Sequence, residues 1–126
     1  MKQLPCTPAQ WLAEIRLAIA DASEAKLFSP PEDTVTDDNL FHLAPLVCLK
    51  FRGRKRDGAE ASRVTEVALA NHVANSTGEA TGHGVNEKPM LAFAVCYVAA
   101  HLALDLLDEQ QADAILAYCE NHLDQG

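Results

Sequence analysis

The stretch from Met90 to Leu107 reads MLAFAVCYVAAHLALDLL, and it constrains the fold more than any other part of the chain. It is long enough for a helix, and its polar residues are His101 and Asp105. A helix that is apolar on nearly all sides must be covered by several neighbours or by a second copy. A regularly patterned segment follows directly, so the two predict a C-terminal helical hairpin whose first arm is the central apolar helix.

The N-terminal region carries the capping residues of a helix. Thr7 suits the N-cap, Pro8 suits the first helical position, and Gln10 completes a capping box. Apolar residues then recur at spacings of three and four, which predicts a helix over about residues 8–26. Residues 29–39 combine two prolines with four acidic residues and predict a solvated connection.

The middle of the chain is less regular. Pro45 predicts a break or kink, because proline lacks a backbone donor. Residues 46–52 alternate as a strand would, but no partner strand is evident, so a helix is the favoured interpretation. Asp57 fits the N-cap of a further helix that ends near Asn75. The Gly-rich and Thr-rich segment 76–89 predicts a long loop.

The last helix is predicted from both its cap and its apolar stripe. Asp108 and Gln111 form a second candidate capping box. The stripe comprises Ala112, Ile115, Leu116, Cys119 and Leu123. Together these patterns predict an all-α fold, a compact bundle of four to five helices, in a single helical domain over residues 1–126. Homodimerisation through the apolar helix stays open as an alternative.

Composition and charge narrow the class of protein. A net charge of -8 argues against broad attraction to phosphate backbones and favours basic partners. The four cysteines show no CxxC spacing, which is typical of buried thiols in a reducing compartment. The opening residues lack the pattern of a secretory signal, and the apolar run is short for a membrane span. These features predict a cytoplasmic protein without a membrane partner.

The most localised charge is a basic cluster that gathers six of the ten basic residues. It comprises Lys50, Arg52, Arg54, Lys55, Arg56 and Arg63. Such a cluster could bind an anion or nucleic acid, or it could form a solvated turn neutralised by acidic residues of the same chain. Because Phe51 is the only aromatic residue nearby that could stack on bases, nucleic-acid binding is kept as an alternative.

A second candidate site pairs His101 with Asp105. Their spacing of four places both on one face of a continuous helix, where they could seat a metal or orient an imidazole. A metal site needs three or four ligands, and His42, His72, His83 and His122 come from separate segments. We therefore expect no cofactor and no metal, with His101 bonded to Asp105 or to a backbone carbonyl. A metal-dependent enzyme that uses this pair is the second alternative.

No complete catalytic constellation is evident, so the leading hypothesis is a small acidic protein that binds another protein. It would act as a regulator, adaptor or inhibitor without catalysis of its own. We expect a partner with a basic surface to meet the acidic residues of the predicted loop and of the last helix. These residues are Glu32, Asp33, Asp37, Asp38, Asp113, Glu120 and Asp124.

Overall fold

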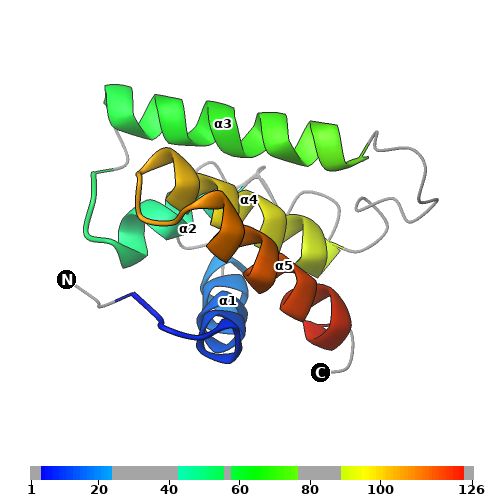
Figure 1. The fold of residues 1–126 in the computed structure, drawn as a ribbon. Coiled ribbons are helices and arrows are strands. Elements are labelled where there is room, and N and C mark those ends of the chain that lie inside the picture. Colours follow the sequence, from blue (N-terminus) through cyan, green and yellow to red (C-terminus); the bar gives the residue numbers. More distant parts are fainter. Residues whose placement is uncertain (1–3, 24–42, 56–57, 77–88, 124–126) are drawn as a thin grey trace.

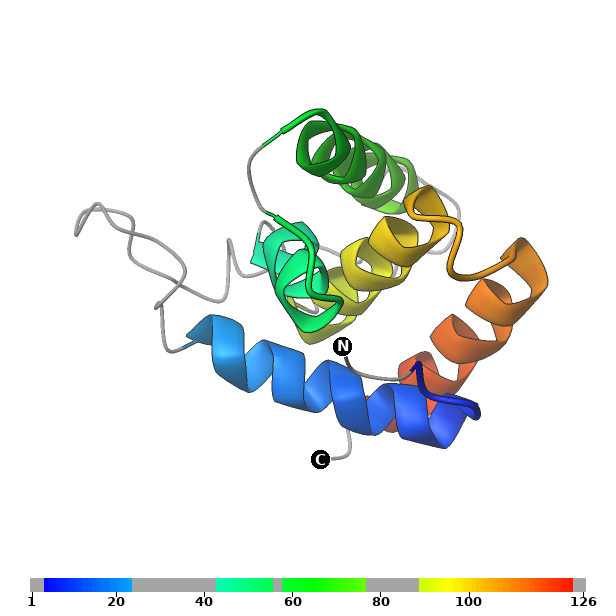
Figure 2. The ribbon, with the colours of Figure 1, turned by 90° about the vertical axis from the view of Figure 1, so that its left-hand side faces the viewer.

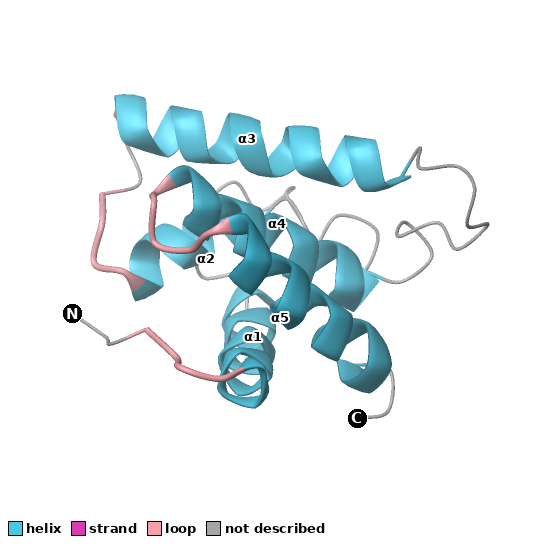
Figure 3. Cartoon of the chain, viewed as in Figure 1, coloured by secondary structure: helices cyan, strands magenta, loops and turns pink. Residues whose placement is uncertain are grey.

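The computed structural model describes residues 4–23, 43–55, 58–76 and 89–123. Within these ranges the chain forms helices and turns and no strand (Figure 3). The helices are α1 (Pro8–Ser23), α2 (Ala44–Phe51), α3 (Ala59–Ser76), α4 (Pro89–Ala103) and α5 (Glu109–His122) (Figure 1). The predicted all-α bundle is therefore confirmed, and so is the helix predicted over residues 46–52.

Helix α4 occupies the centre of the bundle and contacts all four other helices. Its residues from 92 to 101 are at most 5% exposed. Helix α3 runs alongside α4 in both views, while α1 crosses on the opposite side of α4 (Figures 1 and 2). The central position predicted for the apolar helix is confirmed. Burial within one chain covers this helix without a second copy, and homodimerisation stays a prediction.

Both predicted capping boxes are present. The backbone N–H of Gln10 donates to Thr7 Oγ1 at 3.2 Å, and that of Thr7 donates to Gln10 Oε1 at 3.1 Å. At the start of α5, the backbone N–H of Gln111 donates to Asp108 Oδ1 at 2.7 Å, and the side chain of Gln111 accepts from Asp108. These bonds satisfy amides that lack intrahelical partners, which fixes where α1 and α5 begin.

Helix α2 begins one residue before Pro45 and ends in a glycine turn. Pro45 lies in its first turn, where a missing N–H costs no helical hydrogen bond. At its C-terminus Gly53 takes a positive φ of 69°. The N–H of Gly53 donates to Lys50 O at 3.1 Å and the N–H of Arg54 to Leu49 O at 2.8 Å, which is a Schellman motif.

The same motif ends α4 earlier than the apolar run suggests. Asp105 takes a positive φ of 62°, and its N–H donates to Leu102 O at 3.0 Å. The N–H of Leu106 donates to His101 O at 3.0 Å. The expectation that His101 and Asp105 share one helical face is therefore wrong. Asp105 lies beyond the last helical residue and is exposed.

Two arginines hold the arms of the C-terminal hairpin against neighbouring helices. Arg16 of α1 donates to the backbone carbonyl of His122 at 3.1 Å, at the end of α5. Arg63 of α3 donates to the backbone carbonyl of Ala103, at the end of α4. Both guanidinium groups lie at helix C-termini, where unpaired carbonyls and the helix dipole favour positive charge.

Candidate functional site

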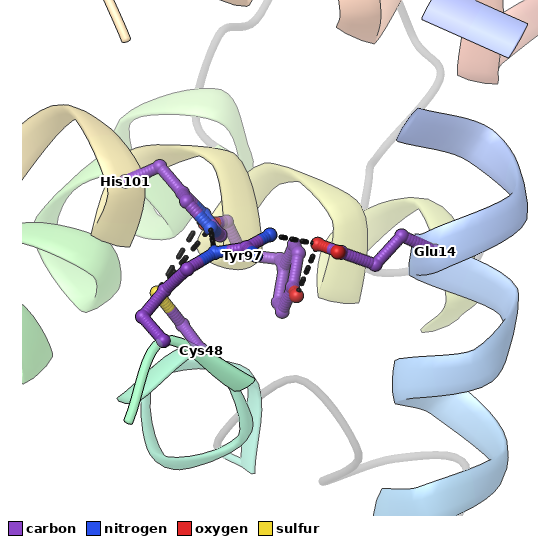
Figure 4. Close-up of polar contacts among 5 residues, drawn as sticks. Glu14, Cys48, Tyr97 and His101 are labelled. Carbon is purple, nitrogen blue, oxygen red and sulfur yellow. Dashed lines mark hydrogen bonds and ion pairs between the residues drawn. The ribbon is translucent and has the colours of Figure 1, made fainter. Parts of the chain in front are cut away.

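A buried network of polar side chains lies where α1, α2 and α4 meet. Its members are Glu14 of α1, Cys48 of α2, Arg52 at the C-cap of α2, and Tyr97 and His101 of α4 (Figure 4). Arg52 is 2% exposed and His101 is 0% exposed. Charged side chains are rarely buried this completely unless they are paired, so this network is the main candidate for a specialised role.

The local structure explains how these side chains converge. Tyr97 and His101 are four residues apart in α4, so they point to the same side of that helix. Arg52 follows the last residue of α2, where the Gly53 turn redirects the chain and leaves the arginine side chain facing α4. Glu14 is partly buried on α1 and reaches the same place.

The hydrogen bonds form a continuous chain from α4 to α1. Arg52 Nε donates to His101 Nε2 at 2.9 Å, and Arg52 also forms an ion pair with Glu14 Oε2. The hydroxyl of Tyr97 donates to that same carboxylate oxygen at 2.7 Å. His101 Nδ1 lies 2.8 Å from the backbone carbonyl of Tyr97 and must donate to it, since a carbonyl can only accept. His101 is therefore neutral, with its proton on Nδ1.

Burial sets the protonation states of this network. It lowers the pKa of His101 to about 4; the charge of Arg52 adds to this effect, and the hydrogen bond to the Tyr97 carbonyl opposes it. Burial also raises the pKa of the Cys48 thiol to about 12. The pKa of Tyr97 is raised as well, by burial and then by the nearby carboxylate of Glu14.

The structure brings together a cysteine and a histidine that sequence reasoning did not pair. Cys48 Sγ lies 3.5 Å from His101 Nδ1, although the two residues are 53 positions apart. A nucleophilic cysteine needs a lowered pKa and access to substrate. Cys48 is completely buried and its pKa is raised, so the pair is a packing contact rather than a catalytic dyad.

Aromatic rings enclose the network. The ring of Trp11 meets that of His101 edge-on, with centroids 4.8 Å apart, and lies 5.7 Å from Arg52 Cζ. The rings of Tyr97 and His101 are 4.7 Å apart. A surface hollow of about 90 Å³ between the start of α1 and α5 is lined in part by Trp11. The network itself is packed between rings in the interior, as expected of a structural cluster.

The basic cluster predicted from the sequence is dispersed in the structure. Arg52 is interior, Lys50 pairs with Asp21 at 2.8 Å, and Arg54 pairs with Glu60 at 2.8 Å. Arg63 caps α4, as described above, whereas Lys55 is exposed and Arg56 lies outside the described residues. The acidic residues that neutralise described members of the cluster are Glu14, Asp21 and Glu60. The sequence suggested other acidic residues for that role, and these lie outside the described residues. They are Glu32, Asp33, Asp37 and Asp38.

The predicted acidic surface is described only on α5. Asp113 and Glu120 are both exposed there. Asp124 and residues 32–38 lie outside the described residues. Among the His, Cys, Asp and Glu side chains that the structure describes, no group of three is arranged to hold a metal ion. His101 bonds to the Tyr97 carbonyl, one of the two partners expected for it, while Asp105 lies apart.

Comparisons with protein-family models, curated proteins and solved structures find no match for this chain. Within the described ranges, no helix is long and apolar enough to cross a membrane.

Proposed function

We propose that this chain binds another protein through the acidic face of α5 and acts as a regulator, adaptor or inhibitor without catalysis of its own. One observation carries the proposal. Nearly all described basic side chains are bound within the molecule, whereas the acidic side chains of α5 have no ion-pair partner among the described residues. The partner is expected to present a basic surface.

The basic side chains are engaged in two ways. Lys50, Arg52 and Arg54 pair with carboxylates, and Arg16 and Arg63 donate to the carbonyls at helix C-termini. Lys55 is the one basic residue in the described ranges for which the structure shows no partner. The positive charge of the described part of the chain is therefore largely neutralised or satisfied in place.

The acidic side chains of α5 are arranged differently. Glu109, Asp113 and Glu120 are exposed, and their spacings of four and seven place them on one flank of the helix. Exposed charges of one sign speed the encounter with an oppositely charged surface and make binding sensitive to salt. Residues 32–38 and Asp124 remain part of the predicted interface.

The nucleic-acid alternative has less support, because it depends on the positive field of the basic cluster. A buried Arg52 cannot reach a phosphate without disrupting the core, and the carboxylates beside Lys50 and Arg54 weaken the field. We also propose a cytoplasmic location. Cys48, Cys96 and Cys119 are buried free thiols on different helices, which suits a reducing compartment.

Charge reversal on α5 tests the proposed interface. The tagged chain and its double variant Asp113→Arg/Glu120→Arg would be used to purify partners from the source cells, with nuclease treatment throughout. We expect a protein partner whose apparent affinity falls about tenfold or more in the double variant, most clearly at low salt. Glu66→Arg is the matched control, since Glu66 is an exposed acidic residue on α3.

Two results would contradict the proposal. One is a partner that the α5 double variant and the wild-type chain retain equally. The other is a set of bound partners that disappears after nuclease treatment and also after replacement of Arg54 and Lys55. That result would favour the nucleic-acid alternative.

A further inference from the structure

The contact between His101 and Arg52 has no place for an additional proton. His101 Nδ1 is used by the Tyr97 carbonyl at 2.8 Å, and Nε2 accepts from Arg52 Nε at 2.9 Å. An added proton must go on Nε2. Two N–H donors and two positive charges would then face each other across one hydrogen bond.

We propose that His101 is an acid-sensitive latch, whose protonation breaks its hydrogen bond with Arg52 and releases α1 from α2 and α4 while α3 and α4 stay packed together. The inference is independent of the partner proposed above. It assigns a conformational role to the buried polar network where α1, α2 and α4 meet.

The groups that face His101 offer no compensation for an imidazolium. Helix α1 contributes the Trp11 ring, α2 contributes the Cys48 thiol, and Arg52 is itself a cation. Glu14 is the carboxylate of the network, and its Oε2 already accepts from Arg52 and from the Tyr97 hydroxyl. The Cys48 thiol and the Tyr97 hydroxyl are neutral under acidic conditions, and burial raises the pKa of each still further.

The same contacts explain why α1 is the element released. Glu14 is bound to Arg52 and to Tyr97, so it ties α1 to the end of α2 and to α4. Trp11 packs against both the His101 ring and the Arg52 guanidinium. When the Arg52 side chain moves away from an imidazolium, α1 loses two contacts at once. These are the ion pair of Glu14 with Arg52 and the packing of Trp11 against Arg52.

The contact between α3 and α4 does not involve the network. It is built from buried apolar residues, among them Val64 and Ala68, and the Cys96 thiol donates to the Ala68 carbonyl at 3.6 Å. Arg63 bridges the same two helices at the end of α4. Burial raises the pKa of the Cys96 thiol to about 12, so this thiol stays protonated where His101 titrates. Helix α3 also carries a buried histidine, His72, which is 6% exposed and does not belong to the network.

Trp11 provides a direct test, because it is the chain's single tryptophan and it touches His101. Tryptophan fluorescence and far-UV circular dichroism would be followed together from neutral pH down to about pH 3. We expect Trp11 emission to shift to longer wavelength about one pH unit above the loss of helical signal. Coincident transitions would mean global acid unfolding and would overturn the latch.

Two variants assign the early transition to His101. His101→Gln keeps a side-chain oxygen that can accept from Arg52 but cannot titrate, so the early fluorescence change should disappear. His122→Gln removes a histidine of α5 that does not belong to the network, and it should leave the transition in place. An early transition that persists in His101→Gln would contradict the inference.

Proteolysis of the wild-type chain keeps the test decisive if His101→Gln does not fold. Brief digestion with pepsin, at a pH between the two transitions, would be read by mass spectrometry. We expect the first cuts within helices to fall in α1, because that helix has been released. First cuts in α3 or α4 would overturn the proposal, as would equal rates across the helices.

Discussion

Apolar side chains pack against helix α4 on both sides, and the side toward α1 and α2 adds a buried polar network. Toward α3 the contact consists mainly of small apolar side chains, such as Val64 and Ala68, that are 0% exposed. Toward α1 and α2 the contact includes an ion pair, a neutral histidine and a tyrosine hydroxyl. Apolar burial is insensitive to pH, whereas a buried ion pair beside a histidine depends on the protonation of each member.

The two sides of α4 also differ in how strictly they specify their side chains. Apolar packing tolerates substitutions of similar volume, because dispersion and burial are not directional. The network requires particular atoms: Arg52 must donate to both His101 and Glu14, and Tyr97 must donate to the same carboxylate. We expect single substitutions in the network to lower the free energy of unfolding more than substitutions on the apolar side. The cost of a substitution on the apolar side should vary less with pH.

The largest effect is expected from Arg52→Met. This change removes the cation and leaves the carboxylate of Glu14 partly buried with only the Tyr97 hydroxyl as a partner. The free energy of unfolding should fall by about 4 kcal/mol, as for other broken buried pairs. Urea unfolding measures it, with Arg54→Met as the matched control. The Arg54–Glu60 pair is exposed, so its loss should cost less than about 1 kcal/mol. Equal costs would show that the buried pair contributes no more to stability than an exposed one.

The next effect is the pH dependence of stability. His101 has a pKa of about 4 when folded and 6.5 as the ordinary value, so the unfolded chain binds more protons between these limits. The free energy of unfolding should therefore fall as pH falls from about 6.5 toward about 4, by about 3 kcal/mol in total. Above that range this group adds no pH dependence. Urea unfolding at several pH values measures the slope, and His101→Gln should flatten it.

The helix caps could be predicted from the sequence because they are local. Thr7 and Gln10 are three residues apart, and so are Asp108 and Gln111, so each motif is readable in a short window. The central position of α4 could be predicted because a helix that is apolar on all sides must be shielded from water on all sides. Both predictions depend on short-range geometry or on burial alone.

The network could not be predicted in the same way. Arg52 lies 38 positions from Glu14 and 49 from His101, and nothing around Arg52 distinguishes it from its exposed neighbours. The polar side chain of His101 in an apolar helix did indicate a need for a partner. It did not indicate which residue would supply one, because that depends on how α1 and α2 pack against α4.

A smaller effect is expected from Val64→Ala on the apolar side. Val64 is completely buried in α3, so removing two methyl groups should lower the free energy of unfolding by about 2 kcal/mol. The cost should be the same at neutral and at acidic pH, since neither valine nor alanine titrates. Urea unfolding of the variant and the wild-type chain at the same two pH values measures it. A cost that changes with pH would show that the two sides of α4 are coupled.

The smallest effect concerns the turn after α4, and here the change is stabilising. Asp105 adopts a positive φ of 62°, which glycine accepts at lower cost than aspartate. Its carboxylate also lies just beyond the C-terminus of α4, where the helix dipole disfavours negative charge. Asp105→Gly should therefore raise the free energy of unfolding by about 1 kcal/mol, as measured by urea unfolding. Asp105→Ala separates the two causes, because it removes the charge but keeps a Cβ at a positive φ. If alanine stabilised the chain as much as glycine, the charge rather than the backbone conformation would be the source of the gain.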